Sequence, residues 1–115
     1  MPTLSTSIFV TFDFVGFHCW PDAPEEVGYL RSRHRHLFKV RAEVSVEHSN
    51  RAIEYHTLKR ELQTDAHEVE FGSLSCELIA LRILQGTVER HPGRPYYRIE
   101  VSEDGENGSI IEARP

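Results

Sequence analysis

The sequence predicts an α+β fold in which an antiparallel sheet of four main strands combines with two helices in the order ββααββ. Apolar and polar residues alternate in two stretches before position 47 and in two stretches after position 96, and such alternation is typical of half-buried strands. Apolar residues with helical spacing lie between these pairs of strands. Strands at both ends of a chain around two helices favour an antiparallel sheet over a βαβ repeat.

The first two strands are predicted at residues 8–14 and 38–46, with the second beginning close to His34. All even-numbered positions in both stretches are apolar, so one face of each strand is expected to pack against the core. Residues 9, 15 and 17 are also apolar. The second face of the first strand is therefore expected to be partly covered as well.

The remaining elements follow from helical spacing and turn residues. A helix is predicted near residues 56–68, with Leu58 and Leu62 on one face. A second helix is predicted after Ser75, a plausible N-cap, with Glu77 in a first turn where the helix dipole favours an acid. Residues 97–101 and 109–113 are expected to form a hairpin around a turn at 104–108. Residues 21–26 and 91–95 are expected to be loops.

Composition limits the classes of protein and partner. A chain of 115 residues suits a single domain spanning 1–115. The formal net charge of −5 argues against a nucleic-acid partner. No apolar run approaches the roughly 20 residues of a membrane span, and residues 1–7 lack the pattern of a secretory signal. These two features predict no membrane partner. Because two cysteines are too few for a disulfide scaffold, we also expect a cytoplasmic protein.

Three of the seven histidines could form a metal site. His34 and His36 are two residues apart at the head of a strand, so they share a face and could both bind zinc. A chain with this many histidines often contains such a pair by chance, and the alternative is that one packs while the other is solvated. His18 continues the even-numbered face of the first strand and approaches the pair if the two strands form a hairpin. Three histidines with an open fourth position describe a catalytic zinc site, whereas His18 alone could simply bond to a backbone carbonyl.

Glu103 and the two cysteines are the other candidates for chemistry. Glu103 ends the apolar face of the strand at 97–101, where a carboxylate must either reach solvent or meet a ligand. Glu77 is explained by its position in the first turn of a helix. Cys76 is expected to be a small buried residue, and Cys19, beside His18, is a possible ligand or nucleophile.

Several short motifs occur in an order that resembles one enzyme family, the 6-pyruvoyl-tetrahydropterin synthases and 6-carboxytetrahydropterin synthases. The resemblance covers about residues 6–112 and implies a T-fold (tunnelling fold), with both helices on one face of the sheet. It also implies a homo-oligomer, a hexamer or another barrel closed through edge strands. The motifs are Phe17-His18, His34-x-His36-x-Phe38, Ile53-Glu54-Tyr55 with Leu58-Lys59, Ser75-Cys76-Glu77-Leu78-Ile79-Ala80 and Ser102-Glu103-Asp104.

The resemblance assigns roles to residues of this chain. It implies that zinc is bound by His18, His34 and His36. It implies that Glu103 grips a pterin ring, beside a helix start that contains Ser75 and Glu77. The implied activity is that of a carbon–oxygen lyase acting on dihydroneopterin triphosphate or on a related pterin or purine-derived ring.

The chain also departs from the family pattern in its proton-transfer residues. The family's catalytic cysteine lies four residues before the first histidine of the His-x-His pair, and this chain has Leu30 there. An adjacent Asp-His pair is replaced by Asp65-Ala66-His67, so Asp65 and His67 are the nearest catalytic candidates. An acid such as Glu25 or Glu26 is an alternative base.

Two functional hypotheses follow from the retained and missing residues. The first is a zinc-dependent enzyme of the tetrahydropterin synthase type. The second is a catalytically inactive or diverged T-fold module that binds zinc and a pterin-like ligand without the standard reaction.

Overall fold

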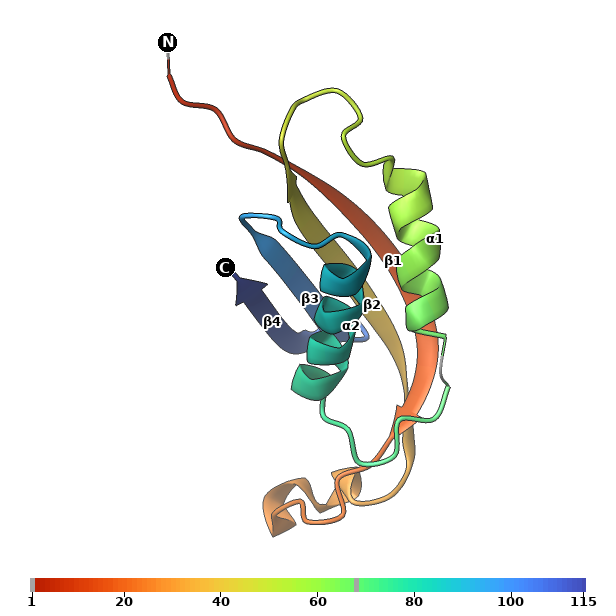
Figure 1. The fold of residues 1–115 in the computed structure, drawn as a ribbon. Coiled ribbons are helices and arrows are strands. Elements are labelled where there is room, and N and C mark those ends of the chain that lie inside the picture. The colour runs from red at the N-terminus through yellow and green to blue at the C-terminus, as the bar shows by residue number, and fades with distance from the viewer. Residues whose placement is uncertain (1, 68) are drawn as a thin grey trace.

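The structure is a computed structural model that describes residues 2–67 and 69–115, and it contains one four-stranded antiparallel sheet in the order β1-β2-β3-β4 (Figure 1). Helix α1 contacts β1, while α2 contacts β3 and β4. Figure 1 shows both helices over the same face of the curved sheet. The elements are β1 (Thr6–His18), η1 (Glu25–Leu30), β2 (His34–Val46), α1 (Tyr55–Asp65), α2 (Cys76–Arg90), β3 (Tyr97–Glu103) and β4 (Asn107–Ala113).

The four-stranded antiparallel sheet with helices confirms the main part of the predicted fold, but the order ββααββ is incomplete. A 3-10 helix, η1, lies between β1 and β2, where a loop over residues 21–26 was expected. Its first turn closes through a hydrogen bond from the Val27 N–H to the Pro24 carbonyl, at 2.9 Å. Helix α1 ends at Asp65, and Glu68, the predicted end of that helix, lies outside the described residues.

The core lies between the helices and the even-numbered face of β1 and β2, as the alternation predicted. Phe38 is fully buried, as are Leu58 and Leu62 of α1. Burial of such a side chain stabilises the fold by about 1.5–3 kcal/mol. Gly16 lies opposite His36 in the β1–β2 ladder, and a Cβ there would lie 2.7 Å from the Phe71 ring. The glycine therefore leaves space for aromatic rings next to the histidine end of the sheet.

The segment that leads into α2 runs across the end of β1. The Phe17 N–H donates to the Val69 carbonyl at 2.7 Å, and the Cys19 N–H donates to the Gly72 carbonyl at 2.8 Å. These bonds hold residues 69–74 beside the end of β1. Helix α2 then begins at its predicted N-cap, where the Ser75 hydroxyl accepts a hydrogen bond from the Leu78 N–H at 3.2 Å. None of the described helices is long and apolar enough to cross a membrane.

Candidate metal centre and ligand pocket

Three histidines from two neighbouring strands meet at one end of the sheet, and we call them the histidine cluster (His18, His34, His36). His18 and His34 are directly opposite in the antiparallel ladder, and His36 is two residues further along β2. The three ring centroids are 4.5–5.2 Å apart. One ring nitrogen from each histidine lies within 4.8 Å of the others. The predicted approach of His18 to the His-x-His pair is therefore confirmed.

Each histidine of the cluster has a hydrogen-bond acceptor on its Nδ1 atom. His18 Nδ1 is 2.9 Å from the Leu74 carbonyl, and His34 Nδ1 is 2.9 Å from the Ser32 carbonyl. His36 Nδ1 is 2.7 Å from the Asp104 carboxylate. Because a carbonyl or a carboxylate can only accept, the proton of each neutral ring is on Nδ1. Each Nε2 atom then carries a free lone pair.

The Nε2 atoms face one another and a carboxylate. His18 Nε2 is 3.0 Å from Glu103 Oε2, and His36 Nε2 is 3.5 Å from the same oxygen. Neither contact has hydrogen-bond alignment, and all three Nε2 atoms are buried without a partner. Lone pairs that converge with a carboxylate repel one another unless a cation lies between them. The cluster therefore fits zinc, which three histidines bind in sites that leave a fourth position open.

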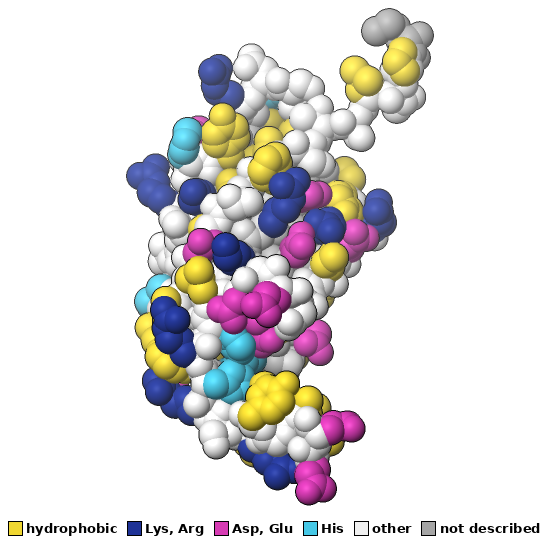
Figure 2. Space-filling model, turned by 180° about the vertical axis from the view of Figure 1, so that it is seen from behind, with side chains coloured by type: hydrophobic (Ala, Val, Ile, Leu, Met, Phe, Trp, Pro, Cys, Tyr) yellow, Lys and Arg dark blue, Asp and Glu magenta, His cyan; other side chains and the backbone are white. Residues whose placement is uncertain are grey.

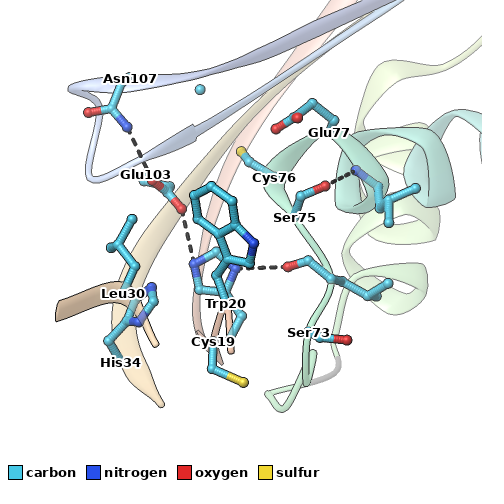
Figure 3. Close-up of a pocket in the computed structure, with 14 residues that line it drawn as sticks. Cys19, Trp20, Leu30, His34, Ser73, Ser75, Cys76, Glu77, Glu103 and Asn107 are labelled. Carbon is cyan, nitrogen blue, oxygen red and sulfur yellow. Dashed lines mark hydrogen bonds and ion pairs between the residues drawn. The ribbon is translucent and has the colours of Figure 1, made fainter. Parts of the chain in front are cut away.

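A cavity of about 400 Å³ opens beside the histidine cluster. Figure 3 shows Glu103 on one side of it and the start of α2, with Glu77, on the other; the Trp20 indole lies between them in this view. Ser75 and Leu30 also line the cavity. On the surface, Figure 2 shows histidine side chains (cyan) next to a group of acidic side chains (magenta). The size suits a small planar ligand, since ligand cavities usually measure about 300–1,000 Å³.

Glu103 is held in place by the β3–β4 turn. Its Oε1 atom accepts a hydrogen bond from the Asn107 side-chain amide at 3.1 Å, and its side chain is about one-fifth exposed. Oε2 faces the histidines and the cavity. The carboxylate therefore has remaining acceptor capacity for a ligand with two adjacent N–H groups.

The two cysteines differ in their surroundings, although both line the cavity. Cys76 is buried, its thiol donates to the Val101 carbonyl at 3.2 Å, and burial raises the pKa of the thiol. A protonated thiol is a poor nucleophile, which agrees with the expectation of a small buried residue. Cys19 is a free, half-buried cysteine.

Asp65 and His67, the predicted catalytic pair, do not line this cavity. The Asp65 carboxylate accepts two hydrogen bonds from Arg90, at 2.9 and 3.0 Å. His67 Nδ1 is 2.5 Å from the Thr64 carbonyl on the surface. Glu25 and Glu26 lie in the first turn of η1 and do not line the cavity either. A catalytic role for these residues stays a prediction.

Two residues of the site had no role assigned to them from the sequence. Asp104 bonds to His36, and the antiparallel register of β2 and β3, which pairs Phe38 with Glu103, is what brings it there. Trp20 is half exposed at the cavity. Its position two residues after a candidate ligand was the available sequence signal.

Comparison with known structures tests the fold. A 6-pyruvoyl tetrahydropterin synthase from Plasmodium falciparum is similar, with a TM-score of 0.74 and 15% identity over 96% of this chain and 99% of that one. A catalytic-residue variant of the Plasmodium vivax synthase gives 0.76 and 13%, over 98% and 100% of the two chains. The fold is that of 6-pyruvoyl tetrahydropterin synthase.

A second group of enzymes has the same architecture. Escherichia coli dihydroneopterin aldolase in complex with neopterin gives a TM-score of 0.67 and 16% identity, over 94% of this chain and 98% of that one. No model of a protein family matches the sequence, and no curated protein sequence matches it. The similarity therefore lies in the three-dimensional arrangement, which agrees with the T-fold expected from the motifs.

Proposed function

We propose that this chain is one T-fold domain that binds zinc through His18, His34 and His36 and acts on a pterin or a related purine-derived ring in the adjoining cavity. The observation that supports this best is the convergence of three buried, unpartnered Nε2 atoms whose Nδ1 atoms are all engaged. Histidines that bind a metal through one ring nitrogen typically donate a hydrogen bond from the other, as Nδ1 does here.

Glu103 is proposed to anchor the ring. A pterin presents a ring N–H beside an exocyclic amino group, and one carboxylate can accept both hydrogen bonds. The side chain faces the cavity and is close to the histidine cluster. A ring held by Glu103 would thus place its substituent next to the metal. Zinc, when bound, supplies polarisation of hydroxyl and carbonyl oxygens of that substituent.

Catalysis also requires a group that moves protons. Leu30 lines the cavity at the position of the family's cysteine, so that group must differ here. One of the similar structures is a Plasmodium vivax synthase in which a catalytic glutamate has been replaced by alanine. A carboxylate is therefore a catalytic group in that synthase. Among the described residues, Glu77 and Glu103 are the carboxylates that line the cavity, and we propose Glu77 as the proton-transfer group.

The second candidate function is a module that binds zinc and a pterin-like ligand without the standard reaction. The apolar side chain of Leu30 in the cavity favours it, because leucine cannot transfer a proton. Both candidates use the same metal centre and the same ring anchor. They differ in turnover alone.

The sheet edges support a proposal of self-association. Strands β1 and β4 are the edges of the sheet, and an edge strand presents backbone groups that can pair with another chain. We propose a homo-oligomer closed through these edges, a hexamer or another barrel. Sedimentation of a monomer at high micromolar concentration would contradict it.

Trp20 provides the experiment for the proposed function, because it is the sole tryptophan of the chain and lines the cavity. Zinc-loaded protein is titrated with dihydroneopterin and with its triphosphate while indole fluorescence is recorded, and products are then separated by chromatography. Quenching with turnover supports the enzyme, and quenching without turnover supports the binding module. Absence of zinc and of ligand binding would contradict both. The Trp20→Phe variant controls for the origin of the signal.

A further inference from the structure

A residue of the turn after β3, Asp104, contacts one histidine of the cluster, His36. Asp104 Oδ2 is 2.7 Å from His36 Nδ1, and Asp104 Oδ1 accepts a hydrogen bond from the Leu37 N–H at 2.9 Å. The Asp104 N–H in turn donates to the Leu37 carbonyl at 2.8 Å. Three hydrogen bonds therefore fix Asp104 against β2, and one of them ends on a proposed metal ligand.

His36 differs from its two neighbours in the kind of acceptor on Nδ1. His18 and His34 have neutral backbone carbonyls there, whereas His36 has a carboxylate. An anionic acceptor orients an imidazole, fixes its proton on Nδ1 and increases the basicity of Nε2.

The backbone of Asp104 indicates that its side chain is needed at this position. Its φ is +59°, in the left-handed region, where a residue with a side chain is uncommon and glycine carries no steric penalty. The next residue is Gly105, whose φ is +77°. A tight turn alone would accept glycine at both positions. The carboxylate at 104 instead makes the two side-chain hydrogen bonds to β2.

We infer that Asp104 is a positioning residue that holds His36 with its proton on Nδ1 and its Nε2 atom directed at the metal. The inference rests on the proposed zinc site. Because Asp104 follows Glu103 directly, the same turn would also set the distance between the ring anchor and the metal. Sequence reasoning assigned no role to this residue.

The test compares three variants with the parent protein. Asp104→Gly removes the carboxylate and is well suited to the positive φ, so the fold is preserved. Asp104→Asn keeps the shape but offers one acceptor oxygen to two donors, His36 and Leu37. Glu106→Gln removes an equal charge from an exposed position in the same turn. Zinc affinity is measured by chelator competition, and the ligand field by the absorption spectrum of the Co²⁺ form.

We expect zinc affinity to fall about 10- to 100-fold in Asp104→Gly and Asp104→Asn, with an altered Co²⁺ spectrum, while the glycine variant still folds. Glu106→Gln should stay within about twofold of the parent, because it removes charge without removing a bond to a ligand. Unchanged affinity and an unchanged spectrum in Asp104→Gly would overturn the inference, since a purely structural turn residue tolerates glycine.

A second readout does not depend on the metal. Long-range ¹H–¹⁵N NMR of the metal-free protein reports which nitrogen of His36 carries the proton. The parent should show the Nδ1–H form, and Asp104→Gly should show a mixture of both forms. An identical proton position in the two proteins would overturn the inference. Failure of the parent to bind zinc, with the NMR difference present, would instead overturn the proposed function.

Discussion

Two clusters of acidic and basic side chains in this molecule look similar in composition but differ in how their groups are paired. The first is the histidine cluster with Glu103. The second lies between the two helices, and we call it the helix cluster (Glu61, Asp65, Arg90, His91). In the helix cluster, the Arg90 guanidinium donates two hydrogen bonds to the Asp65 carboxylate, and His91 Nε2 is 3.0 Å from Glu61 Oε1. In the histidine cluster, three buried nitrogens have no hydrogen-bond partner, although two of them lie 3.0 and 3.5 Å from the Glu103 carboxylate.

The difference separates a self-contained structural arrangement from the proposed ligand site. Every acid of the helix cluster meets a base, so the cluster is complete without a ligand and its contribution is limited to joining α1 and α2. The histidine cluster lacks such pairing. Its three Nε2 atoms have no hydrogen-bond partner, and they face one another and the Glu103 carboxylate beside a cavity. Buried polar groups without partners are rare in folded proteins and require an explanation such as a missing ion.

The largest effect is expected for loss of a proposed zinc ligand. His34→Ala should lower zinc affinity at least about a hundredfold, because one of three proposed protein ligands is removed, and structural zinc sites bind with roughly 10–16 kcal/mol in total. His91→Ala, which removes the histidine of the helix cluster, is the matched control and should bind zinc as the parent does. Metal analysis after dialysis and chelator competition measure both. Equal zinc content in the two variants would remove the distinction between the clusters.

The next effect concerns ligand binding. Glu103→Gln turns an acceptor into a donor that faces the donors of a pterin ring, and ligand affinity should fall by roughly 2–4 kcal/mol. Zinc content and thermal stability should barely change. Quenching of Trp20 fluorescence provides the binding curve, with Glu106→Gln, an exposed acid outside the cavity, as the control for loss of charge. If zinc is lost while ring affinity is kept, Glu103 belongs to the metal centre and is not the ring anchor.

A smaller effect is expected when the helix cluster is broken. Asp65→Asn replaces the charged partner of Arg90, and the midpoint of thermal unfolding should fall by no more than about 5 °C, since partly exposed ion pairs contribute little. Zinc affinity and ligand affinity should stay at the level of the parent. Loss of turnover with both affinities intact would instead support the catalytic role that the sequence predicted for Asp65.

The smallest effect concerns the cap of α1. The Glu54 side chain accepts a hydrogen bond from the Thr57 N–H, and this bond, followed by the contact with His56, lowers its pKa to about 2. The folded pKa is below the unfolded value, so the cap stabilises the fold above about pH 4.5 and loses this effect as the pH falls toward 2. The difference in free energy of unfolding between the parent and Glu54→Gln should shrink over that range. A difference independent of pH would show that the charge of Glu54 has no part in the cap.

Much of the fold followed from local patterns in the sequence. Alternation placed the four strands, and parity on β1 and β2 predicted that His18 would meet His34, because a hairpin brings the end of one strand to the start of the next. The N-cap at Ser75 is also confirmed, and it could be predicted because its hydrogen bond joins residues only three positions apart.

The remaining contacts depend on tertiary structure. Leu74 reaches His18 because residues 69–74 bond to the end of β1, and no spacing in the sequence encodes that contact. Asp104 meets His36 through the register of β2 with β3. The pairing of Asp65 with Arg90, 25 residues away along the chain, could not be predicted from local spacing either. Local composition identified the candidate groups, but their partners decide which groups are available to a ligand.

The central claim is that the Nε2 atoms of the histidine cluster bind one zinc ion. Anomalous diffraction tests it most directly, with data from zinc-loaded crystals recorded on both sides of the zinc absorption edge. We predict a single strong peak about 2.0–2.1 Å from the Nε2 atoms of His18, His34 and His36, with the Nδ1 contacts to Leu74, Ser32 and Asp104 kept. No peak at this position in crystals of protein soaked with zinc, or a peak bound through Nδ1 after rotation of the rings, would contradict the claim.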